Sequence, residues 1–494
     1  MATFLSTTIP YVNARPHLGH ALEFVQADAL ARHLSRADDV FFSSGTDENS
    51  LKNVQSAQRL GEPTAVVVAR HAATFAVLTE QLDVTVDRFV RTSVDQDHMT
   101  GAAALWRRMA ERGDIYSRYY EGVYCVGCEE FRVPADLVNG KCPAHQREPV
   151  VVKERNYFFR LSRYQETLAT ALASGQIRVR PESRRNEMLG LVRGGLTDIS
   201  ISRSTSRAHG WGIPVPGDDS QIMYVWFDAL TNYVNALGWV RDDADYGRFW
   251  RDAARRIHVL GKDVARFHAV YWPAMLMSAG LPLPTDLVVH GHITLSGQKL
   301  SKSLGIVVDP LELVHRYGTE AVRYLMLAEF SPWADAEFTD QRLVTRYNTD
   351  LCNGLGNLVD RVTAMVGCYR GGIVPTAGAR GPLEISLLAT AKSQAASYDE
   401  AFDRFDHQEA VRQLTQLVHA ANAYVNERAP WAVTDHDVLD TALHTLVEVL
   451  RMAARLLGPI LPGASSRMAA ALGTGDNAKI VVKPHLFPRL ELTW

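Results

Sequence analysis

Two histidines three positions apart, His17 and His20, lie where a loop turns into a helical pattern, with Pro16 before them and Gly19 between them. A helix that begins here would present free N–H groups and the positive end of its dipole, an arrangement that binds phosphate. The two imidazoles can add hydrogen bonds to the same anion. Alone the pattern is weak, because such a pair can also be half of a metal site or a polar helix start.

A second basic group occurs in GQKLSKSLG, where Lys299 and Lys302 lie between Gly297 and Gly305. Lysines on a glycine-flanked loop can close over a polyphosphate and stabilise the charge that develops on it. The alternative is an ordinary solvated basic loop. The two motifs fall on opposite halves of the parallel sheet that is predicted below. Together they are far more specific for nucleotide binding than either alone.

Three of the five cysteines cluster in the pattern Cys-x2-Cys-x13-Cys-x2-His, formed by Cys125, Cys128, Cys142 and His145. Three thiolates and an imidazole suit tetrahedral Zn²⁺, and short paired spacings are typical of a zinc knuckle. Because no coordination position stays open, we expect one structural zinc ion. The alternative is a set of scattered free thiols.

The apolar pattern predicts the sheet that must position these groups. Residues 3–8 and 40–44 are predicted to form short buried strands, and the same order returns at 257–260 and 287–289. Between the first two strands the apolar residues fall on one face of a helix, at Leu18, Leu22, Val25 and Ala29. We therefore expect a Rossmann-like parallel sheet of the α/β class, with its ligands at the carboxyl ends of the strands.

A chain of 494 residues is long enough for several domains. We expect a Rossmann-like domain in two halves, 1–115 and 226–344. Residues 116–225, rich in turns and carrying the cysteines, are expected to form a connective insertion. Residues 345–494 are expected to form an α-helical bundle, because their apolar residues recur at helical spacing.

The bulk composition is that of an ordinary globular protein, with 47% apolar and 22% charged residues. A formal net charge of -3 argues against a surface wholly adapted to nucleic acid but permits a local basic groove. There is no basic, apolar leader and no window of eighteen apolar residues. We expect a cytosolic protein that does not associate with membranes.

HLGH and KLSKS resemble the two signatures of class I aminoacyl-tRNA synthetases, usually written HIGH and KMSKS. Further stretches, in the same order and over nearly the whole chain, resemble methionyl-tRNA synthetases: TIPYVNARPHLGH, GTDEN, YCVGCEEF, WGIPVPG, YVWFDALTNYV, GKDVARFHAVYWPAML and NERAPW. The resemblance implies ATP-dependent ligation of L-methionine to initiator and elongator methionine tRNAs through methionyl-adenylate. A paralogue serving another acceptor or amino acid is the alternative. A catalytically dead tRNA-binding module would be expected to lack HLGH or KLSKS.

The resemblance also implies roles for single residues. His17, His20, Lys299 and Lys302 would act in catalysis. ATP, with Mg²⁺ on its phosphates, would be bound by Gly19, Glu23, Gly261, Asp263, Ile293 and Ser301. Methionine would be bound by Ile9, Tyr11, Asp47, Trp226, Ala229, Leu230, Tyr233, Val264 and His268. By periodicity alone, the four of these between 226 and 233 would more often be core packing.

The matching anticodon contacts in the helical region are Asn353, Asn357, Arg361 and Trp431. Without the resemblance, the asparagines could be helix caps and the tryptophan a core aromatic. The chain departs from the family at Asn49-Ser50, where His-Gly is common, and at Leu300 in place of Met. The first departure is compatible with altered inhibitor sensitivity, a changed rate or a different amino acid. The appended oligonucleotide-binding domain of dimeric members is missing, so we expect a monomer.

Overall fold

A parallel sheet of six strands forms the centre of the N-terminal part of the protein. The computed structural model describes residues 1–125, 130–132, 137–143, 147–295, 298–299 and 308–492. The strand order is β3-β2-β1-β12-β13-β7, and all neighbours pair in parallel. Their bounds are β1 Ala2–Ser6, β2 Asp39–Thr46, β3 Arg88–Arg91, β7 Arg178–Arg180, β12 Arg255–Gly261 and β13 Asp286–His290. The four strands expected from the sequence are confirmed.

The two halves of this sheet meet between β1 and β12. From β1 the chain continues outward to β2 and β3, whereas from β12 it continues to β13 on the other side. Such a switch in strand order opens a crevice at the carboxyl ends of the two central strands, which is where open α/β sheets bind ligands. In this protein those ends are Ser6 and Gly261.

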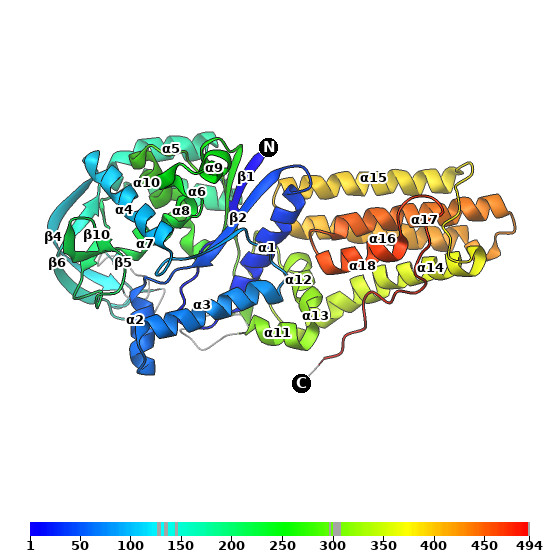
Figure 1. Cartoon of the computed structure of the whole chain (residues 1–494), viewed down its shortest axis with the longest axis horizontal. Coiled ribbons are helices and arrows are strands. Elements are labelled where there is room, and N and C mark those ends of the chain that lie inside the picture. Colours follow the sequence, from blue (N-terminus) through cyan, green and yellow to red (C-terminus); the bar gives the residue numbers. More distant parts are fainter. Residues whose placement is uncertain (126–129, 133–136, 144–146, 296–297, 300–307, 493–494) are drawn as a thin grey trace.

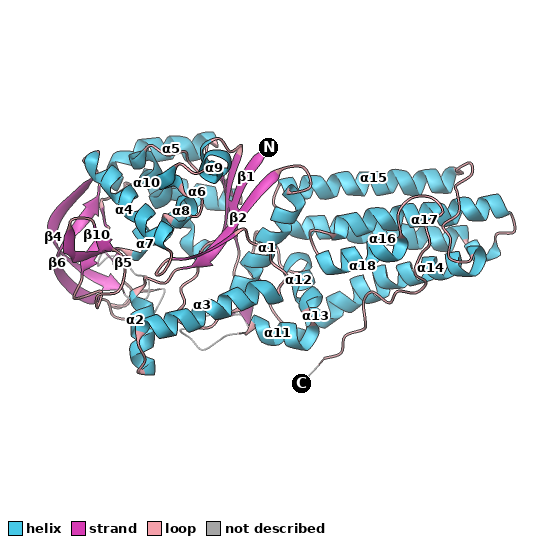
Figure 2. Ribbon diagram, in the orientation of Figure 1, coloured by secondary structure: helices cyan, strands magenta, loops and turns pink. Residues whose placement is uncertain are grey.

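Helices cover both faces of the sheet, as Figures 1 and 2 show. The predicted apolar face of α1 is confirmed, because Leu18, Leu22, Val25 and Ala29 are all buried. The bounds are α1 Leu18–Leu34, α2 Leu51–Leu60, α3 Thr64–Gln81, α4 Gln96–Glu111, α5 Gln165–Ser174, α6 Glu182–Arg193, α7 Val225–Leu230, α8 Asn232–Asn235, α9 Ala244–Tyr246 and α10 Trp272–Ala279.

Two small antiparallel sheets lie at the end of the molecule away from the helical bundle (Figure 2). One contains β4 Ile115–Cys125, β5 Glu130–Arg132, β6 Val150–Phe159 and β8 Ile199–Ser200; the other contains β9 Ser202–Ser204, β10 Pro214–Val215 and β11 Asp218–Met223. Between β6 and β8 the chain returns to the central sheet, because β7 pairs with β13. Residues 178–180, expected to belong to the insertion, are thus an edge strand of the central sheet.

A third small sheet and three helices lead from the central sheet to the bundle: β14 Ile293–Leu295, β15 Gln298–Lys299, β16 Ala336–Glu337, α11 Pro310–Tyr317, α12 Thr319–Ala328 and α13 Asp340–Tyr347. The bundle consists of α14 Asn357–Arg370, α15 Pro382–Asp403, α16 His407–Arg428, α17 His436–Leu457 and α18 Pro462–Leu472. Its helical character is as predicted. The boundary expected near 345 falls inside α13, which continues through the π-helical stretch Asn348–Gly356 into α14.

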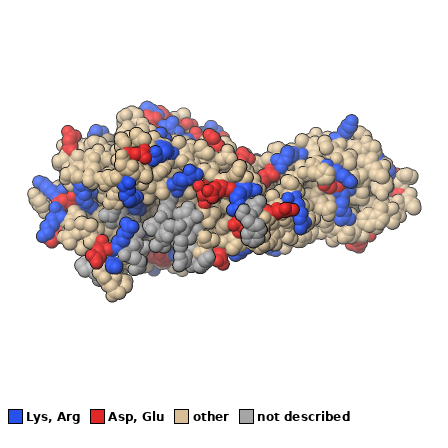
Figure 3. All heavy atoms as spheres, turned by 90° about the horizontal axis from the view of Figure 1, so that it is seen from below, with Lys and Arg blue, Asp and Glu red and all other residues tan. Residues whose placement is uncertain are grey.

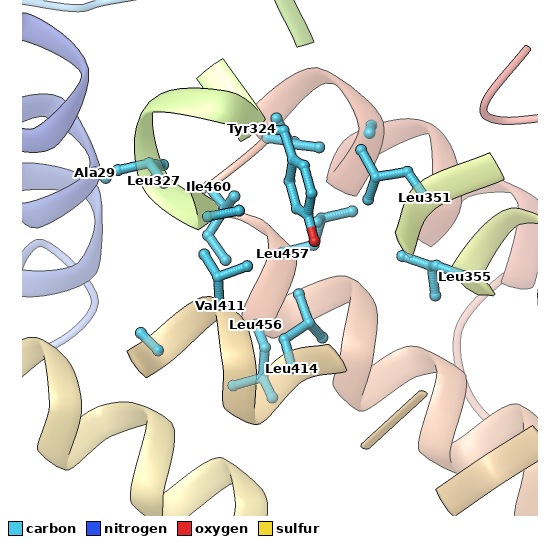
Figure 4. Packing of buried hydrophobic residues seen from close by; sticks show 14 of the residues in the cluster. Ala29, Tyr324, Leu327, Leu351, Leu355, Val411, Leu414, Leu456, Leu457 and Ile460 are labelled. Atoms are coloured by element: carbon cyan, nitrogen blue, oxygen red, sulfur yellow. The ribbon is translucent and has the colours of Figure 1, made fainter. Parts of the chain in front are cut away.

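The bundle is packed firmly against α1. Figure 4 shows Ala29 of α1 and Leu327 of α12 beside Ile460, Val411 and other buried side chains of the bundle. A fully buried arginine, Arg323 of α12, lies at the same junction. It pairs with Asp28 of α1 at 2.7 Å and donates to the carbonyl oxygens of Leu82 and Ile460 at 2.8 and 3.0 Å. The helix that starts at the two histidines is therefore anchored to the bundle by charge as well as by apolar packing.

No helix in the described part of the chain is long and apolar enough to cross a membrane. On the face seen in Figure 3, basic and acidic side chains are interspersed, and this view shows no large field of one sign. This distribution agrees with the near-neutral formal charge of the sequence.

Candidate active site

The two histidines cap the start of α1. The His17 Nδ1 atom accepts the N–H of Gly19 at 3.1 Å, and the His20 Nδ1 atom accepts the N–H of His17 at 3.0 Å. Their rings stack with centroids 3.8 Å apart. The expectation of free N–H groups is therefore wrong for this conformation, because the side chains bind the groups that a helix start otherwise leaves open. Since both Nδ1 atoms accept, each neutral ring carries its proton on Nε2.

The chain just after the KLSKS segment returns to this helix start. The N–H of Leu18 donates to the carbonyl oxygen of Val308 at 3.1 Å, and Arg15 pairs with Asp309 at 2.9 Å. At the start of the segment, the backbone of Lys299 pairs with Thr294 in β14. Ser301 and Lys302 lie outside the described residues. The start of α1 and the chain at Val308, 290 residues further on, are thus neighbours at one edge of the sheet.

Most of the residues expected at an ATP site surround the carboxyl ends of β1 and β12. Glu23 of α1 is buried beneath this edge, where its Oε1 atom accepts the N–H of Thr8 at 2.7 Å and its Oε2 atom lies 3.0 Å from His290 Nε2. Gly261 ends β12, and Asp263 follows in a short helical turn, 3.0 Å from His292 Nε2. Ile293 is buried in β14.

Four residues expected around an amino-acid side chain form an aromatic cluster beside this edge: Tyr11, Trp226, Tyr233 and His268. Phe267, which the sequence did not predict, completes the cluster. The Trp226 ring stacks on Phe267 with centroids 3.7 Å apart and meets Tyr11 edge-on at 6.1 Å. Ala229 and Leu230 are buried on α7, and Val264 packs against the same core. Ile9 lies in the loop after β1, two residues before Tyr11.

A hydrogen-bonded pair of rings lies deepest in this cluster. His268 Nδ1 donates to the carbonyl oxygen of Val264 at 2.9 Å, so its Nε2 atom accepts from the Tyr233 hydroxyl at 2.6 Å. Burial lowers the pKa of His268 to about 4 and holds the pKa of Tyr233 well above its ordinary value. Both rings are therefore neutral at physiological pH, and the apolar character of the cluster is preserved.

Two adjacent acidic residues follow β2. Asp47 is buried and pairs through its backbone with Tyr11, which places its carboxylate beside the aromatic cluster. Glu48 is buried as well and is paired with Arg91 at 2.8 Å. The sequence prediction did not include Glu48, nor the buried pair formed by His98 and Asp228 at 2.5 Å. Asp228 could have been noticed in the sequence, because it is a polar residue in the otherwise apolar helical face of α7.

The four residues expected to contact an anticodon lie on the helical part of the molecule. Asn353 and Asn357 are exposed, and Arg361 donates to Asn426 Oδ1 at 3.3 Å. Neither asparagine caps α14, whose N-terminus has no side-chain cap. Trp431 is 57% exposed, so the interpretation as a core aromatic is wrong.

The expected zinc ligands are only partly within the described residues. Cys125 at the end of β4 and Cys142 are both buried, whereas Cys128 and His145 fall in segments that the structure does not describe. Among the described residues, no group of three or more His, Cys, Asp or Glu side chains is arranged to hold a metal. Two buried thiols with two further soft or imidazole ligands nearby in sequence are a donor set that fits Zn²⁺.

The split parallel sheet, the histidine-capped helix at its edge and the return of the chain to that helix at Val308 are features of a class I aminoacyl-tRNA synthetase. Comparison with known families gives the particular member. The family model of class I tRNA synthetases (M) matches residues 3–148 and 132–363, and the model of the anticodon binding domain of methionyl tRNA ligase matches residues 374–485. The chain belongs to the methionyl-tRNA synthetase family.

Individual relatives agree with this assignment. The chain is 39% identical to a methionine–tRNA ligase of Mycobacterium leprae, covering 96% of this chain and 90% of the relative. It is also 39% identical to one of Mesorhizobium japonicum, covering 98% and 93%. Among solved structures, Mycobacterium tuberculosis methionyl-tRNA synthetase in complex with methionyl-adenylate superposes with a TM-score of 0.91 at 39% identity, over 96% of this chain and 94% of that one.

Proposed function

We propose that this chain ligates L-methionine to methionine tRNA, forming methionyl-adenylate from methionine and ATP and then transferring the methionyl group to the tRNA. The observation that carries the proposal is the meeting of three groups at one sheet edge. The capped start of α1, the chain at Val308 and the aromatic cluster all lie there. Such an edge can bring a carboxylate and an α-phosphate into contact.

In the first step the methionine carboxylate attacks the α-phosphate in line, and pyrophosphate leaves. His17 and His20 would each donate from Nε2 to phosphate oxygens, because their Nδ1 atoms are occupied by backbone N–H groups. Lys299 and Lys302 would stabilise charge on the leaving pyrophosphate, with Ser301 beside them. Asp263 would hold the ribose hydroxyls, and Gly19, Glu23, Gly261 and Ile293 would line the nucleotide site. Mg²⁺ bound to the phosphates would neutralise part of their charge.

The aromatic cluster would enclose the methionine side chain. A thioether is unbranched and polarizable and gains from contact with aromatic rings. Tyr11, Trp226, Tyr233 and His268 would supply those rings, with Ile9, Ala229, Leu230 and Val264 completing the apolar surface. The Asp47 carboxylate would bind the α-ammonium, a charge-assisted contact that also sets the orientation of the substrate.

In the second step the 2′-hydroxyl of the terminal tRNA adenosine would attack the adenylate carbonyl. The far end of the tRNA would be recognised at an anticodon face, defined by Asn353, Asn357, Arg361 and Trp431. The exposure of Asn353, Asn357 and Trp431 supports this role, because splayed loop bases are read by exposed polar groups and by stacking on aromatic rings.

One structural zinc ion would be held by Cys125, Cys128, Cys142 and His145. Replacing Cys125 with Ala is then expected to remove the metal, measured as zinc per chain by atomic absorption. Undiminished zinc in the variant would contradict this assignment.

We further propose that the enzyme works as a monomer in the cytosol. Sedimentation at working concentration would test its oligomeric state.

The decisive experiment measures ATP–pyrophosphate exchange with each of the twenty amino acids, followed by charging of initiator and elongator methionine tRNAs. We expect exchange with methionine and charging of both tRNAs. Exchange with another amino acid would contradict the proposed substrate. Exchange with methionine but charging of neither tRNA would indicate a synthetase that serves a different acceptor.

A further inference from the structure

A buried line of polar side chains links the turn after β2 to the helices that carry the aromatic cluster. Asn49 Nδ2 donates to Asp228 Oδ2 at 2.6 Å, and His98 Nε2 lies 2.5 Å from Asp228 Oδ1. Behind His98, Asn235 Nδ2 approaches His98 Nδ1 at 3.2 Å. Asp228 and His98 are each 1% exposed. None of these side chains has a part in the chemistry proposed above.

The hydrogen-bond directions along this line are fixed by its ends. Trp239 Nε1 can only donate, and it lies 2.6 Å from Asn235 Oδ1, so the Asn235 amide must direct Nδ2 towards His98. Asn235 Nδ2 lies 2.9 Å from Thr231 Oγ1 and 3.1 Å from the His98 carbonyl oxygen, so it also meets the His98 Nδ1 atom as a donor. This leaves His98 Nε2 to share a proton with Asp228. At the other end, Asn49 Nδ2 also donates to the carbonyl oxygen of Thr92 at 3.3 Å. The Asp228 carboxylate thus receives one hydrogen bond from each side.

The line is packed too tightly to shift. A Cβ atom at Gly101 of α4 would lie 1.9 Å from Asn235 Oδ1, so only glycine allows α4 and α8 to approach this closely. Asp228 is itself part of α7, between Trp226 and Ala229. Asn49 follows Asp47 by two residues. The bond from Asn49 to Asp228 therefore fixes the position of Asp47 relative to the helix that carries Trp226 and Ala229.

We propose that Asn49, Asp228 and His98 are positioning residues that set the fit of the amino-acid site, holding Asp47 and the α7 wall at the separation that methionine requires. This inference rests on the proposed methionine site. It also gives the Asn49 departure from the family pattern a physical role: the amide donates to Asp228 without adding a group that titrates near neutral pH.

The test changes the Asp228 carboxylate alone and then exchanges it with the Asn49 amide. In Asp228→Asn, His98 Nε2–H still finds an oxygen, but the new Nδ2 faces Asn49 Nδ2, donor against donor. The methionine KM in pyrophosphate exchange should rise roughly ten- to a hundredfold, the range expected when a buried donor loses its acceptor, while the ATP KM changes less than about threefold. In the double variant Asp228→Asn/Asn49→Asp, a donor again meets an acceptor. Most of the methionine KM should be recovered, incompletely because the carboxylate introduced at position 49 faces the Thr92 carbonyl oxygen.

Asn49→Ala is a milder second variant, with an expected rise of about three- to tenfold in methionine KM from one lost hydrogen bond. Asn156→Ala is the matched control, since Asn156 is also buried and donates to Glu154 at 2.9 Å on β6, away from α7. It should leave the methionine KM unchanged. If Asp228→Asn fails to fold, the comparison of Asn49→Ala with Asn156→Ala decides the question.

Two outcomes would overturn the inference: equal rises in the methionine and ATP KM values in the Asp228 or Asn49 variant, or a double variant no better than Asp228→Asn. Absence of methionine-dependent exchange in the wild-type enzyme would instead contradict the proposed function itself.

Discussion

The aromatic cluster and the anticodon face differ in how complete they are without a ligand. In the cluster the deepest polar atoms are already paired, as in the bond between Tyr233 and His268, and both rings are 1% exposed. On the anticodon face the central aromatic ring, Trp431, is 57% exposed. A small substrate needs a preformed apolar surface, whereas an RNA loop supplies the partner rings itself. Substitutions in the two regions should therefore affect different steps.

The largest effect is expected at the start of α1, where His17 and His20 would contact the phosphates. In His20→Ala the Nε2 donor is lost, along with the Nδ1 acceptor for the His17 N–H. We expect the rate of ATP–pyrophosphate exchange to fall roughly 10²- to 10³-fold, as when a donor to a developing negative charge is removed. The dissociation constant for tRNA, measured by filter binding, should stay within about twofold. A decrease in exchange of only a few-fold would contradict the role of this ring.

A smaller effect is expected from Trp431→Ala, and it should lower tRNA charging rather than pyrophosphate exchange. Loss of a stacked base costs about 1–3 kcal/mol, or roughly ten- to a hundredfold in kcat/KM for charging. Exchange without tRNA should be unchanged, and so should the thermal unfolding midpoint, because the side chain is largely exposed. The control is Trp333→Ala, whose ring is only partly buried and whose Nε1 atom lies 3.4 Å from Asp406 near the start of α16. If both variants lose charging equally, Trp431 has no special part in reading the tRNA.

The two regions also differ in how far the sequence could predict them. The parallel strands and the helix after β1 follow from local apolar spacing, so they were predictable without any relative. Asn353 and Asn357 were expected on one regular helical face, but residues 348–356 form a π-helical stretch, which periodicity at 3.6 residues does not reveal. The exposure of Trp431 was expected only through the family resemblance, because the same residue type more often fills a core.

The long-range parts of the site were the least predictable. That Val308 accepts a hydrogen bond from Leu18 depends on a sheet order that joins segments 290 residues apart. The pairing of β7 with β13 was missed for the same reason, since a three-residue strand has no periodicity of its own. Likewise, no local pattern indicates that Asn49 meets Asp228. The sequence indicates which side chains could take part in binding or catalysis. The contacts between them depend on the three-dimensional arrangement.

The smallest effect concerns acid stability, where the bundle and the cluster each contain one fully buried histidine. Burial lowers the pKa of His407 to about 3 and that of His268 to about 4, against 6.5 in an exposed chain. Between those values the unfolded chain binds more protons than the folded one, so the free energy of unfolding falls as the pH falls. Lowering the pH from 7.5 to 5.5 should cost about 1.4 kcal/mol for each ring.

Replacing His407 with Phe should remove the part of the stability loss that this ring causes. Methionine-dependent exchange should be unchanged, since the His407 ring packs on Phe402 in the bundle and not in the aromatic cluster. His268→Gln should also reduce the acid sensitivity, but at the expense of methionine binding, because a freely rotating amide replaces the ring that the Val264 carbonyl oxygen holds against Tyr233. The measurement is the urea midpoint of each variant at both pH values, beside the methionine KM at pH 7.5. If His407→Phe keeps the full wild-type loss of stability, the acid sensitivity arises elsewhere. If His268→Gln binds methionine normally, the polar pair in the cluster serves stability alone, and the contrast between a preformed site and an open RNA surface loses its strongest support.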